Sequence, residues 1–159
     1  MHVKSSDTST NLESLAGIST YAAGVAQSTA YRLLKKFTED CIGSHNITMM
    51  QWFIIGTIYD AGSTGIGVTE LAHAVDTNVP YITNTLNLLE QKNIIERETR
   101  SGDSRSKVVV ISPHYEPTVR AIEKDLRAKM RETIYANITP NELRTYISVL
   151  YKLSNSLQK

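Results

Sequence analysis

The 159-residue chain has a single cysteine, only four prolines and short apolar runs. One cysteine excludes a disulfide framework and a zinc site built from several cysteines. The longest apolar runs, Phe53 to Ile55 and Val108 to Ile111, are far too short to cross a bilayer. The chain also begins without an apolar signal segment, so we expect it in the cytoplasm, with Cys41 reduced.

The chain also has little net charge, only +1 at pH 7. Residues 1–59 hold four basic and four acidic residues, residues 60–112 hold five and seven, and residues 113–159 hold eight and five. Since no segment is a basic tail, binding to a polyanion would depend on where individual charges lie. With 41% apolar and 21% charged residues, the composition predicts a folded domain rather than a disordered chain.

Sequence motifs of enzymes are absent. No G-x-S-x-G occurs, and the glycines at 62, 65 and 67 are not followed by the lysine of a phosphate-binding loop. The four histidines have no metal-ligand spacing with one another or with the cysteine. We therefore predict a protein that is not an enzyme and needs neither a metal nor a cofactor.

Apolar residues at steps of three and four predict a long helix over residues 12–41, ended by the turn at 43–46. Thr48 and Gln51 match a capping box, in which each side chain bonds the backbone amide of the other. They predict a second helix that ends near Gly62. Thr69 is expected to cap a short helix over residues 70–75.

The most unusual segment is the helix expected over residues 79–92, with Asn78 as its N-cap. A buried stripe is predicted from spacings of three, four and three residues, at Val79, Ile82, Leu86 and Leu89. The opposite face is almost uncharged and consists of Pro80, Tyr81, Thr83, Asn84, Asn87 and Gln91. Since Asn and Thr are poor helix formers, this composition favours a functional surface over the alternative, an ordinary polar one. Asn93 is expected to end the helix in the left-handed conformation.

The remaining chain predicts a hairpin and two more helices. Two β-type runs, 94–98 and 106–112, surround a polar loop. Amphipathic helices follow over residues 118–136 and 141–157, the second opened by a capping box at Thr139 and Glu142. The result is a mainly α fold with a small β-hairpin wing, in the order of a winged helix-turn-helix.

Three segments carry a family resemblance. They are TELA at 69–72, LEQKNIIER at 89–97 and GDSRSKVVVI at 102–111, whose Asp-x-Arg at Asp103 and Arg105 is the most specific element. The chain resembles the MarR family of bacterial transcriptional regulators. The resemblance implies a single MarR-like domain over residues 1–159. Its winged helix-turn-helix core would be residues 48–112, and residues 12–42 and 113–157 would form dimerisation helices.

The resemblance also implies a function, that of a homodimeric repressor that binds a palindromic DNA operator. The helix at 79–92 would enter the major groove with Pro80 at its tip. Its side chains at the base edges would be Tyr81, Thr83, Asn84 and Asn87. An asparagine can pair with adenine through both atoms of its amide.

Basic residues of the hairpin would complete the DNA contact. Arg100 and Arg105 are candidates for the adjacent minor groove, and the resemblance favours Arg105 as a structural partner of Asp103. Lys107 and Arg97 would lie near phosphates. The alternative for each of these arginines is a solvated surface charge, which contributes little.

Two further expectations concern small molecules. The resemblance implies a small aromatic effector, and the residues that could line its pocket are Tyr31, His45, Trp52 and Tyr59. The alternative is that these aromatics belong to the core. Cys41 lies on an apolar stripe, so we expect a buried, unreactive thiol.

A winged-helix module that binds proteins, without sequence-specific DNA binding, is the main competing interpretation. The net charge of −2 over residues 60–112 favours it, because DNA-binding surfaces carry positive charge.

Overall fold

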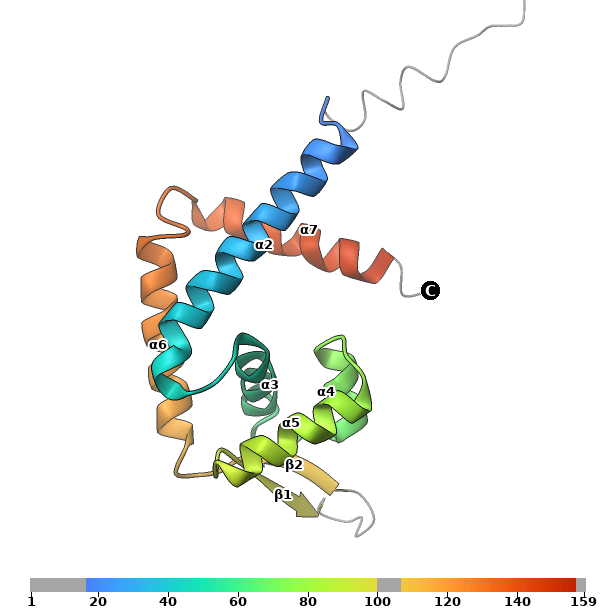
Figure 1. The fold of residues 1–159 in the computed structure, drawn as a ribbon, viewed down its shortest axis with the longest axis vertical. Coiled ribbons are helices and arrows are strands. Elements are labelled where there is room, and N and C mark those ends of the chain that lie inside the picture. The colour runs from blue at the N-terminus through green and yellow to red at the C-terminus, as the bar shows by residue number, and fades with distance from the viewer. Residues whose placement is uncertain (1–16, 100–106, 157–159) are drawn as a thin grey trace, which may run out of the picture. The chain divides into compact units, whose positions relative to one another are not determined.

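The computed structural model describes residues 17–99 and 107–156. It divides into two compact units, with the boundary between Asp40 and Cys41. The described part of the first unit consists of a single long helix, α2, whose last turn crosses the boundary. The second unit contains the remaining helices and the hairpin (Figure 1).

Helix α2 (Thr20–Ile42) begins later than the sequence predicts. Gly17 has a positive φ of 71°, and Ser19 caps the helix by accepting a hydrogen bond from the amide of Ala22 at 3.3 Å. The helix therefore starts at a serine cap that periodicity alone did not reveal. It ends as predicted, at a short 3-10 turn (η1, Gly43–His45) followed by the left-handed Asn46.

Helix α3 (Met49–Asp60) confirms the first capping box. Thr48 Oγ1 accepts from the Gln51 amide at 3.2 Å, and Gln51 Oε1 accepts from the Thr48 amide at 3.1 Å. Two of the amides that a helix start leaves unpaired are thereby satisfied. The helix is the centre of the core, to which it contributes Trp52, Ile54, Ile55 and Ile58.

A second short 3-10 turn (η2, Gly62–Thr64) leads into a backbone bridge between Ile66 and Val109 of the hairpin. A glycine is required at 65, because its φ is 65° and an added Cβ would lie 2.8 Å from Val108 Cγ2. Helix α4 (Val68–Ala74) follows, with Gly67 at its N-cap. The predicted cap at Thr69 is therefore wrong, since that residue already lies in the first turn.

Helix α5 (Val79–Gln91) begins as predicted at Asn78, whose Oδ1 accepts from the Tyr81 amide at 2.9 Å. Ile82, Leu86 and Leu89 are fully buried. The predicted burial of Val79 is wrong: this first residue of the helix is 39% exposed, and Thr85 takes a buried place instead. Asn93 ends the segment with a φ of 57°, as expected.

The hairpin consists of β1 (Ile95–Thr99) and β2 (Lys107–Ile111), paired antiparallel with Ile95 opposite Ile111 and Thr99 opposite Lys107. Helix α6 (Glu116–Glu132) then starts with Pro117 as its second residue, where a missing N–H costs nothing. It ends earlier than the predicted residue 136. Beyond the end of α6, the carbonyls of Tyr135 and Ile138 accept hydrogen bonds from the Arg131 guanidinium, at 3.2 Å and 2.7 Å.

Helix α7 (Pro140–Ser156) is opened by the second predicted capping box. Thr139 Oγ1 accepts from the Glu142 amide at 3.2 Å, and Glu142 Oε2 accepts from the Thr139 amide at 2.8 Å. The Thr139 hydroxyl also donates to Glu142 Oε2, at 2.7 Å, and the two bonds that the Thr139 amide and hydroxyl donate lower the pKa of the Glu142 carboxyl. None of the residues that the structure describes in α7 is buried.

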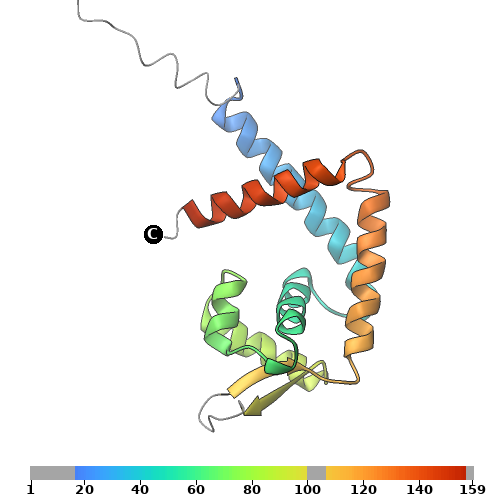
Figure 2. The same cartoon turned by 180° about the vertical axis from the view of Figure 1, so that it is seen from behind.

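In the second unit, α3 packs against α4, α6 and β2, and α5 packs against α4 and β1. The hairpin lies at one end of this group, and α6 runs along one side of α3 (Figure 1). Seen from behind, α6 leads from β2 to the loop that enters α7 (Figure 2). This arrangement is the mainly helical winged helix-turn-helix that the sequence predicts. No helix in the described ranges is long and apolar enough to cross a membrane.

Candidate nucleic-acid interface

The outer face of α5 is the candidate interface. Its polar side chains are exposed, as the sequence predicts, and they follow one another along the helix: Pro80, Tyr81, Thr83, Asn84, Asn87 and Gln91. The three leucine and isoleucine side chains of the opposite face are buried, so the orientation of α5 is determined by the core. The helix therefore presents amides, hydroxyls and a phenol to the outside.

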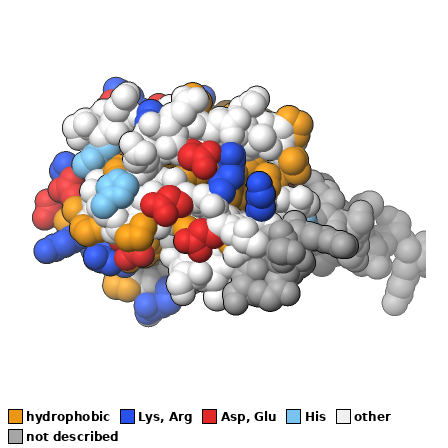
Figure 3. Space-filling view, turned by 90° about the horizontal axis from the view of Figure 1, so that it is seen from below, with side chains coloured by type: hydrophobic (Ala, Val, Ile, Leu, Met, Phe, Trp, Pro, Cys, Tyr) orange, Lys and Arg blue, Asp and Glu red, His pale blue; other side chains and the backbone are white. Residues whose placement is uncertain are grey.

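The described charged residues next to this face are of both signs, with Glu90 and Lys92 at the end of α5 and Glu96 and Glu98 on β1. Seen from below, the described part of the surface carries red and blue side chains side by side, with broad uncharged areas between them (Figure 3). Lys107 is exposed at the start of β2. Arg100, Asp103 and Arg105 lie outside the described residues, so the contacts predicted for the wing stay predictions.

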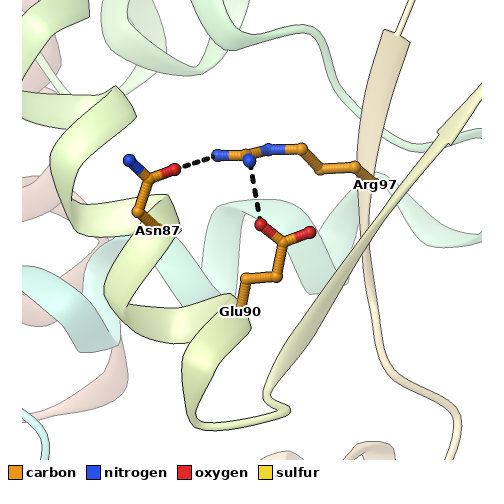
Figure 4. A network of polar contacts seen from close by, with 3 residues as sticks. All are labelled: Asn87, Glu90 and Arg97. Atoms are coloured by element: carbon orange, nitrogen blue, oxygen red, sulfur yellow. Dashed lines mark hydrogen bonds and ion pairs between the residues drawn. The ribbon is translucent and has the colours of Figure 1, made fainter.

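Arg97 joins the hairpin to α5 (Figure 4). From β1, its Nη1 donates to Glu90 Oε2 at 2.8 Å and its Nη2 donates to Asn87 Oδ1 at 2.7 Å. Two residues that the sequence assigned to DNA are thus bonded to each other. Glu90 was not among the predicted site residues, although the motif LEQKNIIER contains both Glu90 and Arg97.

Another contact anchors the end of α5. Lys92 Nζ donates to the carbonyl of Asn46 at 2.7 Å, in the turn that follows α2. An ammonium near the last carbonyls of a helix also interacts favourably with the helix dipole. Both ends of α5 are therefore held in place, by Asn78 at the start and by Lys92 at the end.

The second unit contains a cavity of about 1160 Å³ between α3, α4, α6 and α7. Trp52 and Tyr59 line it, as predicted for an effector pocket. His45 lies on η1, is exposed and does not line this cavity, and Tyr31 lies on α2 in the first unit. Within the second unit, the structure brings Trp52 and Tyr59 together at the cavity but not His45, and the assignment of Tyr31 stays a prediction.

Two of the basic residues that line the cavity, Arg120 and Arg127, are paired with acidic residues of α6. Arg120 Nη1 lies 3.4 Å from Glu116, and Arg127 is hydrogen-bonded to Glu123, which raises the pKa of the Arg127 guanidinium. The charges of these two arginines are thus partly compensated. Cys41 is half-buried rather than fully buried as expected. Within residues 17–99 and 107–156, no cluster of His, Cys, Asp or Glu could hold a metal ion.

The sequence model of the MarR family matches residues 47–107, which span α3, α4, α5 and the hairpin up to the start of β2. This is the segment that the exposed face of α5 and the Arg97 contacts occupy. Residues 47–107 form a MarR family domain.

Solved structures share the fold of this MarR family domain and of the helices around it. AbsC, a MarR family transcriptional regulator from Streptomyces coelicolor, is 19% identical with a TM-score of 0.77, over 89% of this chain and 97% of that chain. Staphylococcus aureus MepR, solved as a DNA complex, is 21% identical with a TM-score of 0.70, over 87% and 96%. A mutant of Escherichia coli MarR, solved with operator DNA, is 18% identical with a TM-score of 0.71, over 93% and 99%.

Together, the MarR family domain and these neighbours support a DNA-binding transcriptional regulator. The family and the similar structures are regulators rather than enzymes. At 18–21% identity the likeness carries the fold but not the roles of single residues.

Proposed function

We propose that the protein is a transcriptional regulator that binds double-stranded DNA in a sequence-specific way, with α5 in the major groove. The observation that carries this proposal is the outer face of α5, which is exposed, polar and almost uncharged. Amides and hydroxyls can read base edges by hydrogen bonding, whereas an ordinary exposed helix is richer in charged residues. The similarity to MepR and MarR, both solved with DNA, supports the same placement.

The wing would add the sequence-independent part of the affinity. Arg100 is proposed to enter the minor groove, with Arg105 held by Asp103 or entering the groove as well, and Lys107 near a phosphate. Since the net charge of the chain is only +1, a few well-placed cations would have to supply the attraction to DNA.

A homodimer would present two copies of α5 to a palindrome with half-sites about one helical turn apart. Helix α7 supports this proposal, because Tyr146, Val149 and Leu153 form an exposed apolar stripe at steps of three and four. We propose that the dimer represses by occupying a promoter in the bacterial cytoplasm. A small aromatic effector in the cavity at Trp52 and Tyr59 would release it by favouring another spacing of the two α5 helices.

The decisive experiment is a selection of preferred sequences from randomised duplexes, followed by anisotropy titrations at two salt concentrations. Asn84→Ala and Arg100→Ala are each expected to weaken binding to the selected site by roughly 5- to 100-fold, the usual range for a lost base contact. Arg100→Ala is also expected to flatten the salt dependence, since one cation fewer displaces counterions.

Matched controls lie on α7. Asn155→Ala and Arg144→Ala remove the same types of side chain from α7, outside the proposed DNA interface and outside the apolar stripe of Tyr146, Val149 and Leu153. These variants should bind DNA as the wild type does. A selection that yields no preferred sequence would overturn the proposal. The acidic and basic residues next to α5 would then favour the other interpretation, a winged-helix module that binds proteins.

A further inference from the structure

The contact between Arg97 and Asn87 determines which atoms of Asn87 are offered to a ligand. A guanidinium has five N–H donors and no acceptor, so the Asn87 atom that faces it at 2.7 Å must be the oxygen. Figure 4 shows the Asn87 oxygen directed at Arg97 and the amide nitrogen directed away from it. The orientation of this amide therefore follows from chemistry, and its donor side is the side turned away from the hairpin.

Arg97 is itself held in place. Its Nη1 donates to Glu90 Oε2 at 2.8 Å, one turn of α5 beyond Asn87, so both branches of the guanidinium are bonded to the same helix. The arginine side chain is only 31% exposed, and the Glu90 carboxylate compensates its charge. Both facts make Arg97 a poor contact for a phosphate and a good support for Asn87.

We propose that Asn87 reads DNA as a hydrogen-bond donor only, and that Arg97 is the positioning residue that imposes this. The inference rests on the proposed function, that α5 lies in the major groove. Adenine presents N7 as an acceptor and N6–H as a donor, so recognition through both atoms of the amide needs the asparagine oxygen. In this chain one of the two lone pairs of that oxygen already accepts from Arg97, and the positive charge of the guanidinium repels a second positively polarised N–H group at the other.

The donor-only amide favours bases that present acceptors. Guanine offers O6 and N7 and thymine offers O4, whereas cytosine offers the N4–H donor and adenine a mixed edge. We therefore expect Asn87 to select guanine or thymine at one position of each half-site. The general expectation that asparagine selects adenine would not hold here.

The test compares base preferences selected from randomised duplexes by the wild type, by Asn87→Ala and by Arg97→Lys. The position read by Asn87 is the one that loses its preference in Asn87→Ala. There the wild type should favour guanine or thymine over adenine by at least about fivefold. Arg97→Lys keeps the positive charge but loses the planar fork, so the released amide should shift the preference toward adenine by a similar factor.

Two controls separate positioning from other roles. Glu90→Gln keeps an oxygen acceptor for Arg97 and should retain the wild-type preference. In the double variant of Asn87→Ala and Arg97→Lys, the lysine should change nothing further at that position, because its effect acts through Asn87. A purely structural role of Arg97 would lower the melting temperature without moving a single base preference.

Three outcomes would overturn the inference while leaving the proposed function in place. The first is a wild-type preference for adenine at the Asn87 position, and the second is an unchanged base preference in folded Arg97→Lys. The third is a loss of affinity in Arg97→Lys that is uniform over all positions, which would indicate that Arg97 contacts a phosphate. If Arg97→Lys does not fold, the comparison of the wild type with Asn87→Ala still shows whether Asn87 selects guanine or thymine rather than adenine. If no protein selects a sequence, the proposed function fails and this inference fails with it.

Discussion

Helix α3 of the MarR family domain and helix α7 begin in the same way but differ in how far their side chains are buried. Helix α3, at the centre of the domain, and helix α7 both begin at a threonine capping box with the same hydrogen-bond pattern. Yet α3 contributes a row of fully buried isoleucines to the core, whereas no described residue of α7 is buried. The comparison shows that helix formation here is decided locally and burial is not.

An isolated helix of 17 residues is marginal in water, since most helix stability in proteins comes from packing an apolar face. The domain provides such packing for α3 and α5 from within one chain. Helix α7 has apolar side chains on its cavity side, such as Ile147 and Leu150, and on its outer side, such as Val149 and Leu153. The outer stripe therefore needs another surface, which is our reason for proposing a second copy of the chain.

The largest effect is expected inside the domain. Leu86 is 0% exposed on α5, so Leu86→Ala removes buried methyl groups and leaves a cavity, at a cost of about 2–5 kcal/mol in the free energy of unfolding. Leu88→Ala is the matched control: Leu88 lies on the same helix but is 49% exposed, so its loss should change the free energy by about 0.5 kcal/mol or less. Urea denaturation measures both. Equal losses would show that the outer face of α5 is also packed.

A smaller effect is expected at α7, on association rather than on the fold. Leu153→Glu places a charge in the middle of the outer stripe, and a proposed dimer interface would lose roughly tenfold or more in affinity, since an unpaired charge is costly to bury. Ser148→Glu adds the same charge on the opposite side of α7 and should leave the dimer intact. Sedimentation at several protein concentrations measures the dissociation constant. A monomeric wild type would contradict the proposed dimer.

Much of this fold could be predicted because the signals are local. Capping boxes, the Asn78 cap and the left-handed Asn93 depend on residues within a few positions of one another, and the structure confirms each of them. The errors also have local causes. Thr69 was predicted to be the N-cap of α4, but Gly67, two residues earlier, is the N-cap. Val79 was predicted to be buried because of its apolar spacing, but it lies at the exposed first position of α5.

The candidate site was predicted less completely. The polar face of α5 follows from helical periodicity, and its exposure is confirmed. The hydrogen bond between Asn87 and Arg97 could not be predicted, because it depends on how β1 lies beside α5 after the turn at Asn93. The prediction that His45 lines the pocket was wrong, because residue type alone does not reveal which helices face each other.

The smallest effect concerns the two capping boxes, which differ in one chemical respect. The box of α3 uses Gln51, which does not titrate, whereas the box of α7 uses Glu142, whose pKa is lowered by hydrogen bonds from Thr139. A carboxyl whose pKa is lower in the folded state stabilises the fold above its unfolded pKa of about 4.3. That contribution is lost as the pH falls through the folded pKa.

Below about pH 4, the Thr139 amide should therefore lose its protection from hydrogen exchange before the Thr48 amide does. In Glu142→Gln, which makes the two boxes alike, this difference should disappear, and its persistence would show that the acid sensitivity of α7 has another origin.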